Sequence, residues 1–326
     1  MQNKIIILIA TLIVAGSLVS PPVDAQDFPT KPVEILCILP PGSGMDLFAR
    51  EVAQIAPKYL KQPVVVINKP GAGGAVAATE LVNSKADGYR LVTLTNISFI
   101  SVFKTQKIMF NPGQLAPLWN FQAVKQGLFV RGDSPWKTLN DLLTHAKKNP
   151  GKLTWGHHLR GSSIHLAALL LFKKAGVDLV EIPHKGSAES MAALLGGHID
   201  VLTTTFSTVT PHVNSGAFRC LVVYEDHRYK DRPEIPCAAE LGYPEVGKLA
   251  TYIGLFSHTN IPDKARAVLT EAMKKTCEDP AFKAGVEKVG EAHLCGGPEL
   301  LKDAITKGEL VVTPALKELG LYVEQK

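Results

Sequence analysis

The amino-acid sequence predicts an α/β protein in which two domains are joined by two crossover strands. Segments with the pattern of buried strands alternate with amphipathic helical segments along most of the chain, and short loops connect them. Such alternation is typical of parallel sheets covered by helices. Two long extended segments, near 119–130 and 251–257, bracket an inserted block. We therefore expect one domain from 26–124 with 255–326 and a second domain from 125–254.

Apolar periodicity places the elements of both domains. Strands are marked by short runs of apolar and β-branched residues, and helices by apolar positions three and four residues apart. The expected strands are 33–40, 63–68, 89–95, a pair within 118–130, 152–155, 179–183, 198–204, 219–224 and 251–257. The expected helices are 45–60, 75–85, 139–148, 164–175, 187–196, 207–215, 263–277, 280–289, 298–308 and a last helix from Thr313.

Several element boundaries carry their own signals. Asn149-Pro150-Gly151 ends the helix over 139–148, because proline and glycine interrupt a helical pattern. Pro262 and Asp263 begin the helix over 263–277, since proline and an acidic residue both suit a first helical turn.

Residues 1–25 have the pattern of a secretory signal peptide. Lys4 supplies a basic start, the run from Ile5 to Val19 is mostly apolar, and Val23-Asp24-Ala25 offers a cleavage site. The alternative is a membrane anchor, but the apolar run is shorter than the ~20 residues that span a bilayer. We expect export to the periplasm, with cleavage after Ala25.

Composition limits the classes of partner. The chain of 326 residues is 46% hydrophobic, which is enough for substantial cores in two domains. Its net charge of +5 is spread over the chain, without the basic run that would indicate nucleic-acid binding. The five cysteines include no CxxC pair. Cys37 is expected in the core of a strand, and a bridge between Cys220 and Cys237 is left open.

Two glycine-rich turns are the most informative feature of the mature chain. Pro41-Gly-Ser-Gly44 follows the first strand, and Lys69-Pro-Gly-Ala-Gly-Gly74 follows the second. A turn of this kind directs backbone N–H groups and the positive end of a helix dipole toward a small anion. The alternative is a plain tight turn. The second turn does not match a dinucleotide fingerprint, because Val76 stands where a small residue is required.

Polar residues after other strands are further candidates for ligand binding. Thr95, Asn96 and Ser98 supply hydroxyls and an amide, although ordinary loop polarity would give the same pattern. Arg160 lies beside Ser162 at the start of a helix. Its guanidinium could meet a ligand carboxylate or an acidic neighbour.

Neither a metal site nor a catalytic nucleophile is predicted. His157, His158 and His165 have no carboxylate or cysteine near them in the sequence, and adjacent histidines rarely bind one ion together. Gly42-Ser43-Gly44 lacks the flanking residues of a nucleophile elbow. We therefore expect no metal, no cofactor and no enzymatic activity.

A series of motifs, in order and spacing, closely resembles one family. The motifs are Phe28-Pro-Thr-Lys-Pro32, Pro40-Pro-Gly-Ser-Gly-Met-Asp46, Pro63-Val-Val-Val-Ile-Asn-Lys-Pro-Gly-Ala-Gly-Gly74, Asp87-Gly-Tyr89, Asn149-Pro-Gly-Lys-Leu153, His184-Lys-Gly-Ser187, Leu195-Gly-Gly-His-Ile-Asp200, Pro211-His212 and Gly254-Leu-Phe256. The chain resembles the Bug family, the TctC-type extracytoplasmic solute-binding receptors of tripartite tricarboxylate transporters. The resemblance covers essentially the whole mature chain.

The resemblance implies a two-domain periplasmic-binding-protein fold of the Venus-flytrap type. Such a receptor binds a small carboxylate between its domains and delivers it to the membrane components of the transporter; we expect a monomer. The matching positions in the first domain are Pro41, Gly42, Ser43, Gly44, Met45, Asp46, Thr95, Asn96 and Ser98. Those in the second domain are His157, Arg160, Ser162, Ser187, Ala188 and Thr204.

Two departures from the family pattern bear on the ligand. Ser43 and Met45 stand where the family usually has a third glycine and a threonine. The turn of the second domain holds His157, His158 and Arg160 in place of small residues. We hypothesise that Arg160, with one of these histidines, meets a second anionic group on the ligand. Arg160→Ala would then weaken binding by roughly 1.5–3 kcal/mol.

Two other functions are left open by the sequence. The first is a carboxylate sensor, which would present its closed form to a signalling protein instead of a transporter. The second is a secreted α/β hydrolase that uses Ser43 or a histidine, for which no base is predicted beside the nucleophile.

Overall fold

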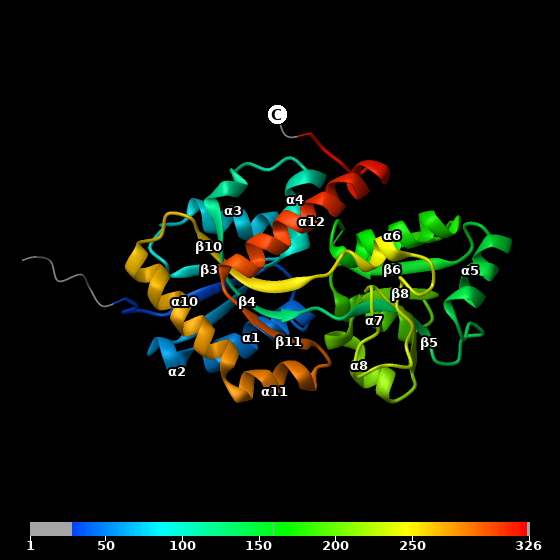
Figure 1. Cartoon of the computed structure of the whole chain (residues 1–326), viewed down its shortest axis with the longest axis horizontal. Coiled ribbons are helices and arrows are strands. Elements are labelled where there is room, and N and C mark those ends of the chain that lie inside the picture. The colour runs from blue at the N-terminus through cyan, green and yellow to red at the C-terminus, as the bar shows by residue number, and fades with distance from the viewer. Residues whose placement is uncertain (1–27, 159, 325–326) are drawn as a thin grey trace, which may run out of the picture.

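The computed structural model describes residues 28–158 and 160–324, so the predicted signal peptide lies outside the described residues. Two sheets lie side by side, each with helices on its faces (Figure 1). The predicted α/β architecture with two crossover strands is confirmed. None of the helices in the described ranges has both the length and the apolar character needed to cross a membrane.

Sheet A has the strand order β11-β4-β10-β3-β1-β2. Its strands are β1 (Val33–Cys37), β2 (Val64–Asn68), β3 (Arg90–Thr95), β4 (Leu115–Ala123), β10 (Tyr252–His258) and β11 (Ala292–Gly296). Its helices are α1 (Gly44–Ile55), α2 (Pro57–Leu60), α3 (Ala75–Asn83), α4 (Asn96–Thr105), α10 (Asp263–Glu278), α11 (Pro280–Lys288) and α12 (Pro298–Glu318), with short 3-10 turns at Ala72–Gly74 and Pro112–Gln114.

Sheet B has the strand order β7-β6-β8-β5-β9. Its strands are β5 (Gln126–Arg131), β6 (Thr154–His158), β7 (Val180–His184), β8 (Val201–Thr205) and β9 (Phe218–Val223). Its helices are α5 (Leu139–Lys148), α6 (Ser163–Ala175), α7 (Ser187–Leu195), α8 (Phe206–Asn214) and α9 (Pro244–Gly247).

Both sheets are mixed, whereas the sequence led us to expect parallel sheets. β1 pairs in parallel with β2 and β3, but β10 is antiparallel to both β3 and β4. In sheet B, β5 is antiparallel to β8 and β9. The chain enters β5 directly from β4 and enters β10 from the other sheet. No helical crossover links these strands to their neighbours, so nothing forces them to run in parallel.

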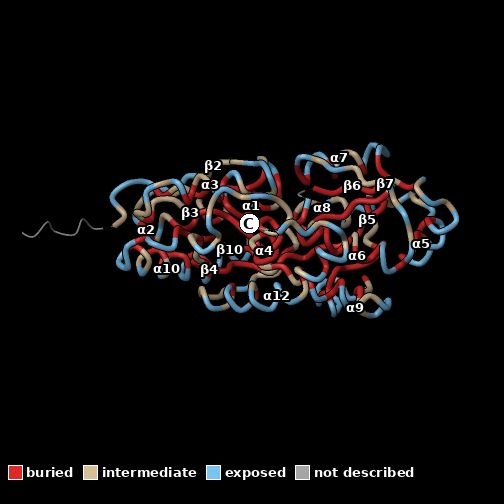
Figure 2. The backbone as a smooth tube through the Cα atoms, turned by 90° about the horizontal axis from the view of Figure 1, so that it is seen from above, coloured by how far each residue is buried: buried red, intermediate tan, exposed pale blue. Residues whose placement is uncertain are grey.

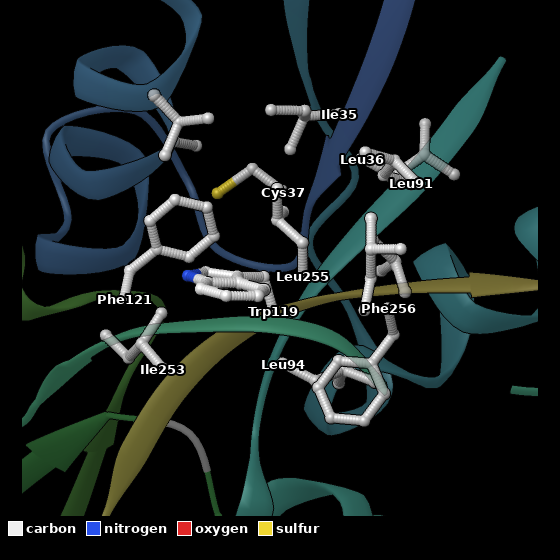
Figure 3. Packing of buried hydrophobic residues seen from close by; sticks show 14 of the residues in the cluster. Ile35, Leu36, Cys37, Leu91, Leu94, Trp119, Phe121, Ile253, Leu255 and Phe256 are labelled. Carbon is white, nitrogen blue, oxygen red and sulfur yellow. The ribbon is translucent and has the colours of Figure 1, made fainter. Parts of the chain in front are cut away.

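Each sheet has its own apolar core. In sheet A, Trp119 and Phe121 of β4 pack with Cys37 of β1 and with Leu255 of β10 (Figure 3). In sheet B, one cluster lies around Trp155 on the side that α6 covers, and a second lies on the side of α7 and α8. Buried backbone runs through the interior of both halves, while the outer helices alternate buried and exposed positions (Figure 2).

Helix α12 is longer than predicted and joins the two halves. It runs unbroken through Pro314, where the sequence led us to expect a break between 308 and 313. A Cβ atom on Gly308 would lie 2.9 Å from Cδ1 of Ile100, so glycine lets α12 lie close against α4. Val312 and Leu316 belong to the core that lies under α6. Tertiary packing therefore outweighs the local break signal.

The cysteines pair differently from the bridge that the sequence left open. Cys277 of α10 forms a disulfide with Cys295 of β11, across 18 positions. Cys220 and Cys237 are free, because an isolated parallel bridge places Cys237 beside Val223 instead of Cys220. Cys37 is buried in the core of β1, as predicted.

Candidate functional site

Four helices begin around one enclosed cavity between the two sheets. The cavity is lined by residues from the first turns, or the caps, of α1, α4, α6 and α8. Each of these helices has at least nine residues. The positive end of a helix dipole and its free N–H groups attract negative charge. Four such ends at one cavity favour negative charge, and at the start of α8 the carboxylate of Glu291 already accepts a hydrogen bond from the backbone N–H of Ser207.

The cavity is small. It holds ≈ 50 Å³, and since a water molecule needs ~10–15 Å³ it has room for roughly four waters or a ligand of that size. Its lining is made of Leu39, Gly44, Met45, Thr95, Ser98, Val124, His158, Ser162, Ser163, Ile164, Thr205, Ser207, Thr251 and Ile253. Five of the predicted positions lie in it: Gly44, Met45, Thr95, Ser98 and Ser162.

The electrostatic character of the cavity comes from backbone groups and not from charged side chains. Its lining contains no Lys, Arg, Asp or Glu in the described part of the chain. Burial, together with the neighbouring His157 and His184, lowers the pKa of the His158 ring to about 4. His158 is therefore neutral at physiological pH. Positive potential in the cavity comes from helix dipoles and backbone N–H groups.

Two polar atoms of this lining have no hydrogen-bond partner in the described residues. They are the hydroxyl of Ser98 and Nδ1 of His158. Both side chains are at least nine-tenths buried. A buried polar group without a partner costs about 1–3 kcal/mol, so such atoms normally bind water or a ligand.

A row of polar side chains extends from His158 across sheet B. His158 pairs in register with His184, and Thr204 lies level with His158, because Gly156 pairs with Leu202. The row lies on the face of sheet B that α7 covers, and Ser187 is the first residue of that helix. Nε2 of His184 and the hydroxyls of Thr204 and Ser187 also lack partners in the described residues. Two predicted positions, Ser187 and Thr204, thus lie behind the cavity rather than in its lining.

The carboxylate of Asp46 holds the first glycine turn in place through hydrogen bonds. Oδ2 of Asp46 accepts hydrogen bonds from the backbone of Gly42 and from Nε of Arg50, both at 2.9 Å, and Oδ1 accepts from Asn68 at 2.8 Å. Burial alone would raise the pKa of the Asp46 carboxyl. The hydrogen bonds from Arg50, Asn68 and the backbone outweigh burial and hold this pKa below its ordinary value.

Other predicted positions have structural roles or lie on the rim. Ser43 caps α1, since its hydroxyl accepts a hydrogen bond from the backbone N–H of Asp46 at 3.2 Å. No histidine hydrogen-bonds to Ser43 in the described residues, so the geometry does not favour a hydrolase. Asn96 bonds to the backbone of Ala250 and Tyr252 and thereby joins α4 to the second crossover. Pro41, Gly42 and Ala188 are exposed.

Close contacts of glycines across the cleft show that the two halves are closed on one another. A Cβ atom on Gly44 would lie 2.6 Å from the hydroxyl oxygen of Ser207. A Cβ atom on Gly161 would lie 3.4 Å from Oγ1 of Thr105, and one on Gly186 would lie 3.5 Å from Cγ of Pro40. Several glycines of the turns therefore allow close approach of the two halves.

A second and wider cavity of ≈ 440 Å³ lies at the mouth of the cleft. The second glycine turn, Pro70–Gly73, forms one side. Arg160, His184 and Lys185 form the other. The guanidinium of Arg160 lies here rather than in the enclosed cavity, and it pairs with Oε2 of Glu181 at 3.1 Å.

His157 and His165 face Glu181, a carboxylate that the sequence reasoning missed. Oε1 of Glu181 lies 2.9 Å from Nε2 of His157 and 3.3 Å from Nε2 of His165. Hydrogen bonding with His165 outweighs burial and, with further bonds from His157 and Arg160, holds the pKa of Glu181 well below its ordinary range. Burial and the neighbouring His165 lower the pKa of His157 to about 4.

The tautomer of His165 disfavours a metal ion at this group. Nδ1 of His165 accepts a hydrogen bond from the backbone N–H of Gly161 at 3.1 Å. The proton of a neutral His165 ring is therefore on Nε2, the nitrogen that faces Glu181. A metal ion at Nε2 would require loss of this proton. The group is better described as a buried hydrogen-bond network beneath α6.

Comparison with known proteins agrees with this geometry. The model of the family "Tripartite tricarboxylate transporter family receptor" (TctC) matches residues 48–295. A UPF0065 protein from the gbd 5′ region of Cupriavidus necator is 34% identical over 284 residues, which are 86% of this chain and 85% of that protein. Protein BugT of Bordetella pertussis is 30% identical over 240 residues, 72% of this chain and 73% of that protein.

The chain belongs to the tripartite tricarboxylate transporter receptor family. Among solved structures, the periplasmic binding protein BugD is 25% identical and superimposes with a TM-score of 0.85 over 91% of this chain and 100% of that chain. MatC of Rhodopseudomonas palustris with bound malate (23% identity, TM-score 0.79, 87% and 100% covered) and a second R. palustris protein with adipate (23%, 0.84, 90% and 99%) share the fold.

Membership in the TctC family fixes the broad class of the protein. Receptors of this family are extracytoplasmic proteins that bind solutes. The family resemblance pointed to Thr204 but not to Thr205 or Ser207. Thr205 and Ser207 could have been found by analogy, because they follow strand β8 and open α8 just as Thr95 and Ser98 follow β3 and open α4. Leu39 and Glu181 offered no such signal.

Proposed function

We propose that this protein is a periplasmic receptor that binds a small carboxylate in the enclosed cavity and delivers it to the membrane components of a tripartite tricarboxylate transporter. The observation that carries the proposal is the convergence of four helix N-termini on a cavity without charged side chains. A carboxylate would accept hydrogen bonds there from Ser98 and from the backbone at the helix starts.

The size of the cavity and the chemistry of structural neighbours support the same class of ligand. A space of ≈ 50 Å³ suits a carboxylate with few further atoms. Proteins of this fold have been solved with malate and with adipate, both of which are carboxylates. We keep the division into 26–124 with 255–326 and 125–254 as part of the proposal, with the ligand between the two parts.

Arg160 can contact only a ligand that reaches the mouth cavity. Its guanidinium lies in the mouth cavity and pairs with Glu181, while His157 is buried beneath α6. Arg160 would therefore meet a second anionic group only on a ligand that extends from the enclosed cavity into the mouth. His157 would act indirectly, by holding Glu181.

The first test is a thermal-shift panel of carboxylates against the mature protein, residues 26–326, with the neutral amide of each acid as its control. A ligand at a hundred times its dissociation constant stabilises a protein by about 2.7 kcal/mol. We expect stabilisation by an acid and none by its amide. Equal stabilisation by both, or none by any acid, would contradict the proposal.

Export can be tested separately from binding. If the signal peptide is cleaved after Ala25, intact-mass measurement of the protein from the periplasmic fraction gives a chain that begins at Gln26. A chain that still begins at Met1 in the membrane fraction would contradict the proposed location.

A further inference from the structure

We propose that Leu39 sets the greatest length of ligand that the protein accepts, an inference that rests on the proposed carboxylate-binding function. Leu39 lines both the enclosed cavity of ≈ 50 Å³ and the mouth cavity of ≈ 440 Å³. Among the described residues it is the one shared by the two linings. The residue is only 6% exposed, and from its place in both linings we infer that it forms a partition between them.

The partition is held in place from both sides of the cleft. The carbonyl oxygen of Leu39 accepts a hydrogen bond from Nδ2 of Asn68 at 2.9 Å, and the same nitrogen donates to Asp46 at 2.8 Å. Leu39 is followed by Pro40, whose ring lies against Gly186 of the opposite half. The backbone of Leu39 is therefore held by contacts that also hold the first glycine turn, so a longer ligand cannot push this part of the chain aside without breaking them.

The chemistry of the mouth cavity differs from that of the enclosed cavity. Arg160 and Lys185 bring cationic side chains to its lining, which contains no Asp or Glu in the described part of the chain. Arg160 is 67% exposed in its side chain and pairs with Glu181 from outside the sheet, so it can turn toward a carboxylate in the mouth. In the wild-type protein, Leu39 stops a ligand before it reaches these groups.

The consequence is a ligand-length limit that a single side chain imposes. Acids short enough for the enclosed cavity bind well, and longer homologues meet the Leu39 side chain. Shortening this side chain should join the two cavities. A longer α,ω-diacid could then place one carboxylate at the helix starts and the other beside Arg160, with a charge-assisted bond at each end.

The test is the affinity of the mature protein for unbranched acids of increasing length. The probes are the monocarboxylates from acetate to octanoate and the dicarboxylates from malonate to suberate, measured by calorimetry on wild type and Leu39→Ala. We expect wild type to bind the short acids and to lose affinity beyond a certain length. Leu39→Ala should bind the longer acids roughly tenfold more tightly than wild type, because a pocket gains on this order from each well-placed group.

Three further variants make the result specific. Leu39→Met conserves volume and should keep the wild-type limit. Leu39→Val removes less volume and gives a second reading if Leu39→Ala folds poorly, which circular dichroism will show. Adding Arg160→Ala to Leu39→Ala should abolish the gain for long diacids and leave the gain for long monoacids.

The outcomes separate this inference from the proposed function. If wild type binds short acids and both Leu39→Ala and Leu39→Val keep the wild-type limit, Leu39 is not the partition and the inference is overturned. If wild type binds no acid of any length, the proposed function fails, and the role of Leu39 falls with it.

Discussion

The carboxylate of Glu291 accepts a hydrogen bond from the backbone N–H of Ser207, with an Oε1–N distance of 2.9 Å. Glu291 lies between α11 and β11 beside sheet A, and Ser207 lies in the first turn of α8 beside sheet B. The other oxygen of Glu291 accepts a hydrogen bond from the backbone N–H of Lys125, at 2.5 Å. One buried carboxylate thus joins sheet A to the first crossover and to a helix start that lines the enclosed cavity.

We expect the ionisation of Glu291 to make stability depend on pH. Burial raises its pKa to about 7, against the hydrogen bonds from Lys125 and Ser207, which lower it. Because the folded-state pKa lies above the ordinary value of 4.5, the stabilisation is fully present below pH 4.5 and is lost as pH rises through about 7. At about 1.4 kcal/mol per pKa unit, the loss is on the order of 3 kcal/mol.

The measurement is the free energy of unfolding by urea from pH 4.5 to pH 8, on wild type and Glu291→Gln. The amide does not titrate, so the free energy of unfolding of wild type should fall relative to that of Glu291→Gln as pH rises. Burial also raises the pKa of Glu225 to about 7, but Glu225 is present in both proteins and cancels in the difference. Parallel curves over this range would show that Glu291 does not titrate there.

We expect Gly44→Ala to oppose closure of the cleft. The new Cβ atom would lie 2.6 Å from the hydroxyl oxygen of Ser207 and 3.2 Å from Oγ1 of Thr205. Gly44 begins α1, where alanine is otherwise favourable, so the fold of each half should be retained. Ligand affinity should fall roughly tenfold or more, as one such clash costs more than about 1.4 kcal/mol.

Small-angle X-ray scattering and ligand titration test the closure prediction together. Gly44→Ala should have a larger radius of gyration than wild type in the presence of ligand. Gly44→Ala combined with Ser207→Ala removes the nearest oxygen and should recover part of the affinity, measured against Ser207→Ala alone. Wild-type scattering and affinity in Gly44→Ala would rule out a steric role for Gly44.

Removal of the disulfide should lower stability without changing the ligand. Cys277 and Cys295 close a loop of 18 positions between α10 and β11. In the chain-entropy model, a loop of this size contributes about 3 kcal/mol. Denaturation of the Cys277→Ser, Cys295→Ser double variant should show a loss of this order, and dithiothreitol should lower the melting temperature of wild type but not that of the variant. If dithiothreitol lowered the melting temperature of both proteins equally, its effect would not come from the Cys277–Cys295 disulfide.

Zinc should not stabilise the protein through the network of His157, His165 and Glu181. The backbone N–H of Gly161 occupies Nδ1 of His165, so Nε2 carries the proton and cannot coordinate a metal ion. Thermal shifts with equimolar Zn²⁺ and with EDTA should coincide. A stabilisation by Zn²⁺ that disappears in His157→Ala would show that the network rearranges to bind the ion.

Local signals were sufficient for most of the elements and for five of the fourteen residues that line the enclosed cavity. The glycine turn before α1 and the hydroxyl residues Thr95 and Ser162 could be predicted, because the signals for a strand and a capped helix start lie within a few consecutive residues. The same signals indicated an anion without a charged side chain. They missed α4 as a helix, although its cap, Thr95, had been identified as a polar strand end.

The other residues of the site are brought together by contacts between segments that lie far apart in the sequence. Glu181 meets His157 because β7 pairs with β6, and Glu291 reaches Ser207 because the chain returns to sheet A after building sheet B. Leu39 divides two cavities because the halves close on one another.

The sequence by itself thus determined ten of the eleven strands in the described residues (β11 was missed), most of the helices, the glycine turns and the family. The strand directions, the cysteine pairing, the depth of the cavity and the position of Arg160 in the mouth were decided by the tertiary structure. The physical reason is that turn chemistry and periodicity act over a few residues, whereas these features depend on which surfaces meet when two separately packed cores close together.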